Sequence, residues 1–145
     1  MRKPEQLLWD SLKRTMGTLW RIQRHEDKHS PDVPDLSYSC RMCSGWLELK
    51  VLDKWPASPT APLDFALSHF TLSQRSWLRR HGEMGSGHCY LLAKIGGNFL
   101  LVRWSQLQHL GVWTRDEWVR GAAGYWGNHL DPHDLAERIS RPPPE

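Results

Sequence analysis

The sequence predicts an α/β domain with a central mixed β-sheet flanked by helices. Two hairpin signals supply strands, one over residues 35–52 and one in which aliphatic segments flank Gly96-Gly97. Apolar residues at helical spacing supply helices over 4–19 and from Thr71 onward. At 145 residues, the chain buries roughly two thirds of its unfolded surface around one core, so we expect a single domain.

The first helix, over 4–19, is predicted by one apolar stripe with Pro4 in its first turn. Its stripe consists of Leu8, Leu12, Met16 and Leu19. The charged, proline-bounded stretch 21–34 is predicted to be a loop.

The hairpin that follows places strands at "DLSY" and "GWLELKVL", joined by the polar segment "SCRMCS". A period of two puts Leu47, Leu49 and Val51 on one face of the second strand. Trp46, Glu48 and Lys50 then share the opposite face. After this strand, the proline-rich stretch 53–68 is predicted to be a surface loop.

The second helix begins with a capping box in which Gln74 stands three residues after Thr71. Phe70, Gln74 and Trp77 lie on one stripe of this helix, so Gln74 faces inward or toward a cleft. Shorter helices are predicted after Thr114 and over "DPHDLAERIS", ahead of a flexible tail, 140–145.

Composition excludes a disordered chain, because 39% of the residues are hydrophobic and nine are Trp. No apolar run approaches the ~18 residues of a membrane span, and the charged N-terminus does not suit a signal peptide. Three cysteines without a framework spacing fit a reducing compartment. We therefore expect a cytoplasmic protein with no membrane partner.

Three ionisable side chains of the first hairpin can meet at the rim of the sheet. Asp35 begins one strand, and Glu48 and Lys50 share one face of its antiparallel neighbour. Two neighbouring carboxylates repel unless a cation lies between them, and Mg²⁺ accepts one or two carboxylates together with a substrate phosphate. A nearby ammonium would stabilise the charge that develops during phosphodiester hydrolysis.

The same residues resemble the signature of PD-(D/E)XK nucleases, with Pro34-Asp35 followed by "ELK" at 48–50. Three accompanying pieces resemble the VRR-NUC branch and phage-encoded Holliday-junction resolvase-like proteins: an N-terminal helix with Glu5, a Ser-Pro-x-x-Pro-Asp turn, and "LSQRSWLRRHG". The resemblance covers roughly 5–103 and implies a restriction-endonuclease-like core. Residues 104–139 would then form a C-terminal helical extension.

The resemblance implies a role for each matching position. Asp35, Glu48 and the backbone carbonyl of Leu49 would bind Mg²⁺ or Mn²⁺, with help from Glu5. Lys50 would be catalytic, and Gln74 would give polar support. Phosphate contacts are expected from basic residues near these motifs, namely Arg24, Lys28, Arg75, Arg79 and Arg80.

These features together predict a metal-dependent endodeoxyribonuclease, structure-selective on branched DNA such as a Holliday junction. Symmetric cleavage of a junction needs two active sites, so we expect a homodimer. If a phage encodes the chain, the protein acts in the host cell. An alternative enzyme is a nicking or nonspecific phage nuclease.

Other interpretations of the same residues remain open. Glu48 and Lys50 could form a charge pair on a solvated strand face, and Glu5 could be an acid favoured by the helix dipole. The pair Cys40 and Cys43 could bind zinc in a non-catalytic nucleic-acid-binding or inhibitory module, although the sequence lacks a second ligand pair with the right spacing. Exposed tryptophans, with Trp55 and Trp113 as candidates, could stack on bases.

Overall fold

A single mixed sheet of six strands organises the computed structural model, which describes residues 4–25, 33–65, 70–85 and 87–141. The strands lie in their chain order, and β3 and β4 are parallel while the other neighbouring pairs are antiparallel. The strands are β1 (Arg21–Arg24), β2 (Leu36–Cys40), β3 (Cys43–Leu52), β4 (Cys89–Ile95), β5 (Asn98–Arg103) and β6 (Gly124–Trp126).

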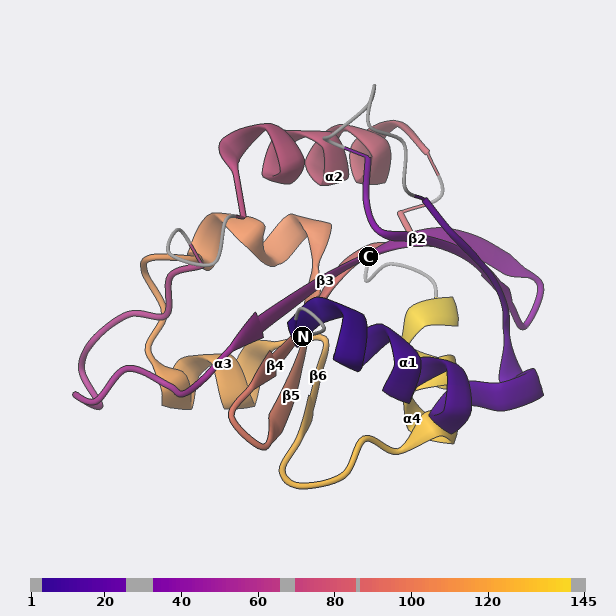
Figure 1. Ribbon diagram of the computed structural model, residues 1–145. Helices are drawn as coiled ribbons and strands as arrows, with labels where there is room; N and C mark the ends of the chain where they lie inside the picture. Colours follow the sequence, from indigo (N-terminus) through magenta and orange to yellow (C-terminus); the bar gives the residue numbers. More distant parts are fainter. Residues whose placement is uncertain (1–3, 26–32, 66–69, 86, 142–145) are drawn as a thin grey trace.

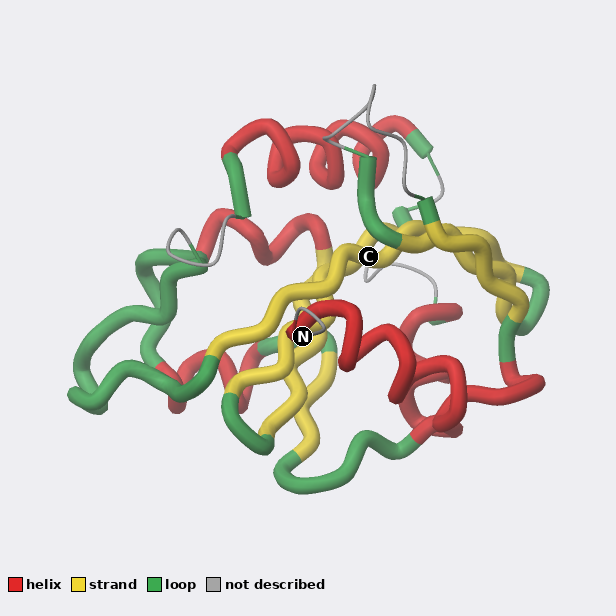
Figure 2. Tube along the Cα trace, viewed as in Figure 1, coloured by secondary structure: helices red, strands yellow, loops and turns green. Residues whose placement is uncertain are grey.

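Helices cover both faces of this sheet, which confirms the predicted α/β architecture (Figures 1 and 2). One face packs against α1 (Pro4–Met16) and α4 (Pro132–Ser140). The other face packs against α2 (Leu72–Met84), the 3₁₀ helix η3 (Trp104–His109) and α3 (Arg115–Gly121). The parallel β3–β4 step needs a long crossover connection, and the segment that contains α2 supplies it.

The first helix confirms the predicted apolar stripe, because Leu8, Leu12 and Met16 are buried. The α-helix ends at Met16, before the predicted end of the 4–19 range. Gly17 has a φ of +51°, and the next turn is the 3₁₀ helix η1 (Gly17–Leu19). A left-handed glycine is a common way to end an α-helix.

The predicted hairpin is confirmed, but its strands are longer than expected. Arg41 and Met42 form the turn with φ values of 48° and 68°, which match a two-residue type I′ turn. Cys40 pairs with Cys43 on either side of this turn. Ser39 and Cys40 therefore lie in β2, and Cys43 and Ser44 lie in β3. All four were predicted to belong to the connection.

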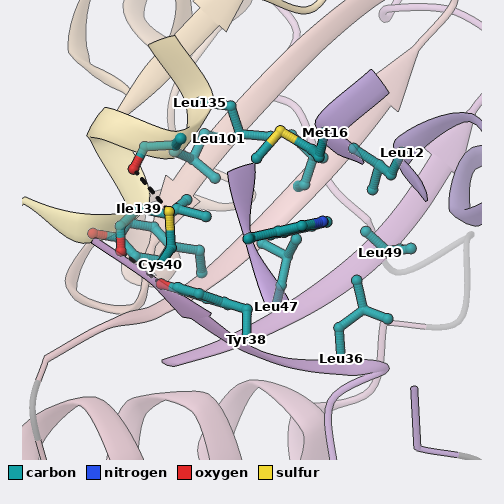
Figure 3. Close-up of a cluster of buried hydrophobic side chains, with 14 of the residues drawn as sticks. Leu12, Met16, Leu36, Tyr38, Cys40, Leu47, Leu49, Leu101, Leu135 and Ile139 are labelled. Atoms are coloured by element: carbon teal, nitrogen blue, oxygen red, sulfur yellow. Dashed lines mark hydrogen bonds between the residues drawn. The ribbon is translucent and has the colours of Figure 1, made fainter. Parts of the chain in front are cut away.

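The core between the sheet, α1 and α4 fixes which face of the hairpin points inward. Figure 3 shows side chains from both helices meeting Leu47 and Leu49 of β3. Both leucines are buried, and each buried leucine contributes about 1.5–3 kcal/mol to stability. Tyr38 of β2 adds a hydrogen bond from its hydroxyl to the carbonyl of Ile139 at 2.7 Å. Because strand residues alternate, Trp46, Glu48 and Lys50 share the opposite face, as predicted, and the structure shows that α2 covers this face.

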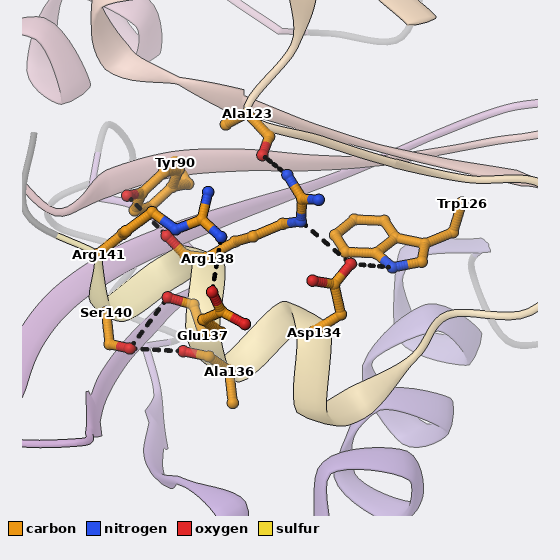
Figure 4. A network of polar contacts seen from close by, with 9 residues as sticks. All are labelled: Tyr90, Ala123, Trp126, Asp134, Ala136, Glu137, Arg138, Ser140 and Arg141. Atoms are coloured by element: carbon orange, nitrogen blue, oxygen red, sulfur yellow. Dashed lines mark hydrogen bonds and ion pairs between the residues drawn. The ribbon is translucent and has the colours of Figure 1, made fainter. Parts of the chain in front are cut away.

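The C-terminal segment 104–139 differs from the predicted helical extension, because it also supplies an edge strand. There β6 pairs with β5, and α4 anchors this edge (Figure 4). Asp134 accepts hydrogen bonds from Trp126 Nε1 at 3.1 Å and from Arg138 Nε at 3.0 Å. Of the predicted tail, Ser140 ends α4, and 142–145 lie outside the described residues.

One further element corrects the sequence prediction. The stretch 21–34 was expected to be a loop, yet Arg21–Arg24 forms strand β1 at the edge of the sheet and pairs with β2. The predicted loop is confirmed for its described part, 53–65, which has neither helix nor strand, but Trp55, Leu63 and Phe65 of this loop are buried in the core on the α2 side.

Candidate active site

Asp35 and Glu48 face each other across the β2–β3 pair. The register joins Leu36 to Leu47, and one step further along the two strands brings Asp35 opposite Glu48. Directly opposite residues share a face of the sheet. The backbone N–H of Leu49 donates to Oδ2 of Asp35 at 2.8 Å, which holds this carboxylate at the end of β2. The predicted meeting of the two acids is therefore present.

The strand face that carries Glu48 and Lys50 is not solvated. Glu48 is only 2% exposed and Lys50 only 7% exposed. The alternative of a solvated charge pair is therefore wrong. Burying ionised groups costs several kcal/mol unless partners or a changed protonation state compensate, so this position requires a physical explanation.

Protonation supplies part of that explanation, because the pKa of Glu48 is raised from 4.5 to about 10. Burial is the largest cause, followed by a hydrogen bond with the Asp35 carboxyl group and by the negative charge of Asp35. Lys50 and the backbone of Leu49 act in the opposite direction without overcoming these effects. At neutral pH and without a cation, Glu48 therefore holds a proton beside Asp35.

One oxygen of this site has no hydrogen-bond partner among the described residues. Glu48 Oε2 is buried and accepts no hydrogen bond from the part of the chain that the structure describes. Such an orphaned oxygen costs free energy. An oxygen-seeking divalent cation would satisfy it and would replace the proton between the two acids. Asp35 and Glu48 thus fit the donor chemistry of Mg²⁺ or Mn²⁺.

The backbone carbonyl of Leu49 is consistent with the same cation site. In a strand, the N–H and C=O of one residue point toward the same neighbouring strand. The N–H of Leu49 reaches Asp35, so its carbonyl also points to the β2 side. β2 begins at Leu36, directly after the acid that this N–H contacts.

Lys50 lies beside the acids on the same face of β3. Its Nζ is 5.7 Å from the centre of the Phe70 ring, a cation–π arrangement. Phe70 is buried immediately before α2. The start of α2 is thereby placed over the Lys50 end of the strand face.

Gln74 completes the predicted capping box at the start of α2. Its side-chain Oε1 accepts a hydrogen bond from the backbone N–H of Thr71 at 3.0 Å, and its backbone N–H donates to Thr71 Oγ1 at 3.1 Å. This capping function is confirmed. Gln74 stands four residues after Phe70, and its predicted support of the acids stays a prediction.

Glu5 is not brought to the acids by any contact of the described residues. It lies in the first turn of α1, in the helical layer on the other face of the sheet. Within the described ranges, no group of three or more His, Cys, Asp or Glu side chains is placed to hold a metal ion. The structure thus assembles a pair of acids from β2 and β3, without Glu5 as a third.

The basic residues of α2 that were predicted to contact phosphate differ in exposure. Arg79 and Arg80 are exposed on α2. Arg75, also predicted to contact phosphate, has its Nη2 3.4 Å from Asp64 Oδ1, and its Nε donates to the carbonyl of Phe70 at 3.2 Å. It therefore anchors the start of α2.

The remaining two candidates are Arg24, in strand β1, and Lys28. Arg24 is half-buried, donates to the side chain of Gln6 and stacks over the Trp9 ring on the α1 side. It therefore also helps to hold the structure together. Lys28 lies outside the described residues.

The zinc alternative finds no ligand set in the described part of the chain. Cys40 Sγ is buried and directed at the carbonyls of Leu19 and Ala136, at 3.5 and 3.7 Å. Cys43 Sγ is 3.2 Å from the carbonyl of Ser140. Both thiols thus contact backbone carbonyls of the α1–α4 side, and burial raises the pKa of Cys40.

The two tryptophans expected to be exposed are packed instead. Trp55 is buried, and its Nε1 donates to Asn98 Oδ1 at 2.8 Å. Trp113 stacks on His109 with ring centres 3.9 Å apart. Trp55 is therefore held in the core, whereas Trp113 is half-buried with one face of its ring covered by His109.

An aromatic cluster that the sequence did not predict lies beside the acids. Trp46 is half-buried, and its ring is 5.0 Å from that of His25 and 4.9 Å from that of Trp77. Trp77 in turn stacks on His81 at 3.5 Å. The alternation of β3 predicted Trp46 on the Glu48 face. Its partners are His25, which directly follows β1, and Trp77 of α2, and the position of His25 depends on the strand that the sequence analysis missed.

No helix in the described ranges is long and apolar enough to cross a membrane.

In comparisons with known proteins, no protein-family model and no curated protein matches this chain.

Proposed function

We propose that this protein is a Mg²⁺- or Mn²⁺-dependent DNA endonuclease that hydrolyses phosphodiester bonds. One observation carries the proposal: buried Glu48 and half-buried Asp35 contact each other across the β2–β3 pair, Glu48 Oε2 has no partner among the described residues, and buried Lys50 lies on the same face. A purely structural role would not need a lysine and two carboxyl groups gathered at one largely buried edge of the sheet.

Asp35, Glu48 and the Leu49 carbonyl would hold the cation. When bound, it would polarise the phosphate and lower the pKa of a water molecule. Glu48 would release its proton when the cation binds, and the Leu49 N–H keeps the Asp35 carboxylate oriented.

Lys50 supplies a fixed positive charge at this patch. Because it is buried, its interaction with a phosphate is less screened by water than that of a surface lysine. The contact with the Phe70 ring restrains the ammonium before substrate binds. Its role is to stabilise the negative charge that develops on the phosphate or to orient the attacking water.

Branched DNA such as a Holliday junction is the favoured substrate, through the resemblance to resolvase-like nucleases. Exposed Arg79 and Arg80 on α2 support contact with phosphates near the acids. Symmetric cutting of a junction requires a two-fold homodimer, which light scattering of the purified protein tests directly.

The test of the function is cleavage of a labelled four-way junction and of a linear duplex of the same sequence, with Mg²⁺, with Mn²⁺ and with EDTA. We expect cleavage that requires the cation and is faster on the junction. Equal rates on both substrates would favour the nicking or nonspecific nuclease. No cation-dependent cleavage of either substrate would overturn the proposal.

A further inference from the structure

A hollow of about 620 Å³ opens on the sheet next to the acid pair. We call it the β1–β3 hollow, because strands β1, β2 and β3 form its floor and the C-terminal half of α2 forms one wall. The lining residues that matter here are Arg21, Gln23, Ser37, Ser39, Trp46 and His81. Its volume is that of a pocket for a small organic ligand and is too small for a duplex.

The floor of the hollow continues the strand face that carries the acids. Asp35, Ser37 and Ser39 alternate along β2, and the register pairs Ser37 with Trp46. Two residues along a strand span about 7 Å. The hollow therefore begins one such step from the Asp35–Glu48 pair, on the same face of the sheet.

Aromatic rings stand at the side of the hollow. Trp46 and His81 both line it, and His81 is exposed. Trp77 packs against both rings and keeps them in place. A second hollow of about 410 Å³ lies beyond this stack, with Trp77, Arg80 and His81 in its wall.

The polar and charged lining suits a nucleotide. Serine hydroxyls and the Gln23 amide offer donors and acceptors to a base edge, and Arg21 offers an exposed guanidinium to a phosphate. No Asp or Glu stands among the described residues that line the hollow. Its charge therefore complements an anion.

We infer that the β1–β3 hollow binds one unpaired nucleotide of the DNA substrate, with the base against Trp46 and His81 and the phosphate on Arg21. Base stacking on aromatic side chains tolerates any sequence. The inference rests on the proposed nuclease function and refines its substrate class: DNA in which a single-stranded segment, such as the strand exchange point of a junction or a flap, adjoins the scissile bond.

Binding of a labelled oligothymidylate of about twelve nucleotides to the full chain in EDTA tests the inference, with fluorescence anisotropy as the readout. We expect Trp46→Ala and His81→Ala each to weaken binding about tenfold. Arg21→Ala should reduce the slope of log K against log salt by about 0.7, the share of one phosphate contact on a single strand. Arg14→Ala, exposed on α1 across the sheet, is the matched control and should leave both quantities unchanged.

Folding and function are separated by further measurements. Trp46→Phe keeps an aromatic ring and should retain most of the binding. The melting temperature of each variant checks that changing a ring packed against Trp77 leaves the fold intact. The inference is overturned if the wild type does not bind the oligonucleotide. It is also overturned if the Arg21 and His81 variants bind as tightly as the wild type. If binding is unaltered in this way but cleavage requires the cation, the nucleotide-binding role of the hollow is rejected and the nuclease function is retained. If the variants bind more weakly but no DNA is cleaved, the binding role is retained and the nuclease function is rejected.

Discussion

The backbone N–H of Leu49 donates to Oδ2 of Asp35 at 2.8 Å, so the acid directly before β2 is positioned by the strand that carries its partner Glu48. The hydrogen bond needs an acceptor oxygen, whereas cation binding needs a negative charge. A substitution can separate the two requirements.

Asp35→Asn should abolish cleavage while leaving the fold intact. The amide oxygen can still accept from Leu49, but the charge for the cation is lost. A metal contributes several kcal/mol to transition-state stabilisation, so we expect a loss of about 10²–10³-fold or more in cleavage rate. Asp35→Ala should in addition lower the free energy of unfolding by about 1–3 kcal/mol, because the Leu49 N–H loses its acceptor. Cleavage assays and urea denaturation measure the two effects, and wild-type activity in Asp35→Asn would refute the assignment.

Glu48→Gln should change how stability depends on pH. The pKa of Glu48 is raised from 4.5 to about 10 in the folded protein, so between these values the folded state holds a proton that the unfolded state has released. The stabilising contribution of this group is therefore fully present below pH 4.5 and falls as the pH rises toward 10, by up to about 1.4 kcal/mol per unit. Glutamine has no proton to hold. In EDTA, the variant should gain stability relative to the wild type as the pH rises from 5 to 9, measured by urea denaturation.

The same proton couples to the cation. Mg²⁺ displaces it, so the apparent affinity of the wild type for Mg²⁺ should increase with pH. Added Mg²⁺ should raise the melting temperature of the wild type and not of Glu48→Gln. Glu83→Gln, at an exposed position on α2, serves as the control and should behave as the wild type does. Parallel pH profiles for Glu48→Gln and wild type would contradict the buried, protonated acid.

The alternation of β3 was enough to predict which residues share the active face. Leu47 and Leu49 are too apolar to leave the core, and this fixes Glu48 and Lys50 on the other side. The hairpin then brings Asp35 to the same edge. Burial of the pair could not be predicted in this way, because it depends on Phe70 and the start of α2, which lie far along the chain.

Strand β1 escaped prediction because its sequence, Arg-Ile-Gln-Arg, carries only one apolar residue. Ile22 packs on the α1 side, while Arg21 and Gln23 line the open hollow on the other. The strand is held by pairing with β2, a tertiary effect that outweighs local propensity. Trp55 was predicted to be exposed for a related reason. Its proline-rich surroundings indicate a loop, but the indole is buried and donates a hydrogen bond to Asn98 in β5.

Lys50→Met should lower turnover far more than DNA affinity. Methionine keeps most of the aliphatic stem, so packing against Phe70 is largely preserved while the charge is removed. We expect kcat to fall by about 10²–10³-fold, the usual cost of removing one preorganised electrostatic contact, with a nearly unchanged dissociation constant for DNA in EDTA. Lys94→Met on β4 is the control. Equal losses in turnover and affinity would mean that Lys50 mainly binds phosphate.

Gln74 can be tested for its two roles with two substitutions. Gln74→Glu keeps an acceptor at the third helical position, so the bond from the Thr71 N–H should persist and thermal stability should stay near that of the wild type. Gln74→Ala loses that bond and should destabilise the protein by about 0.5–2 kcal/mol. If Gln74 also supports the acids, Gln74→Glu should cleave more slowly despite its intact helix cap, because it adds negative charge near an anionic substrate. Melting curves and cleavage rates of both variants decide this, and full activity in Gln74→Glu would restrict Gln74 to capping.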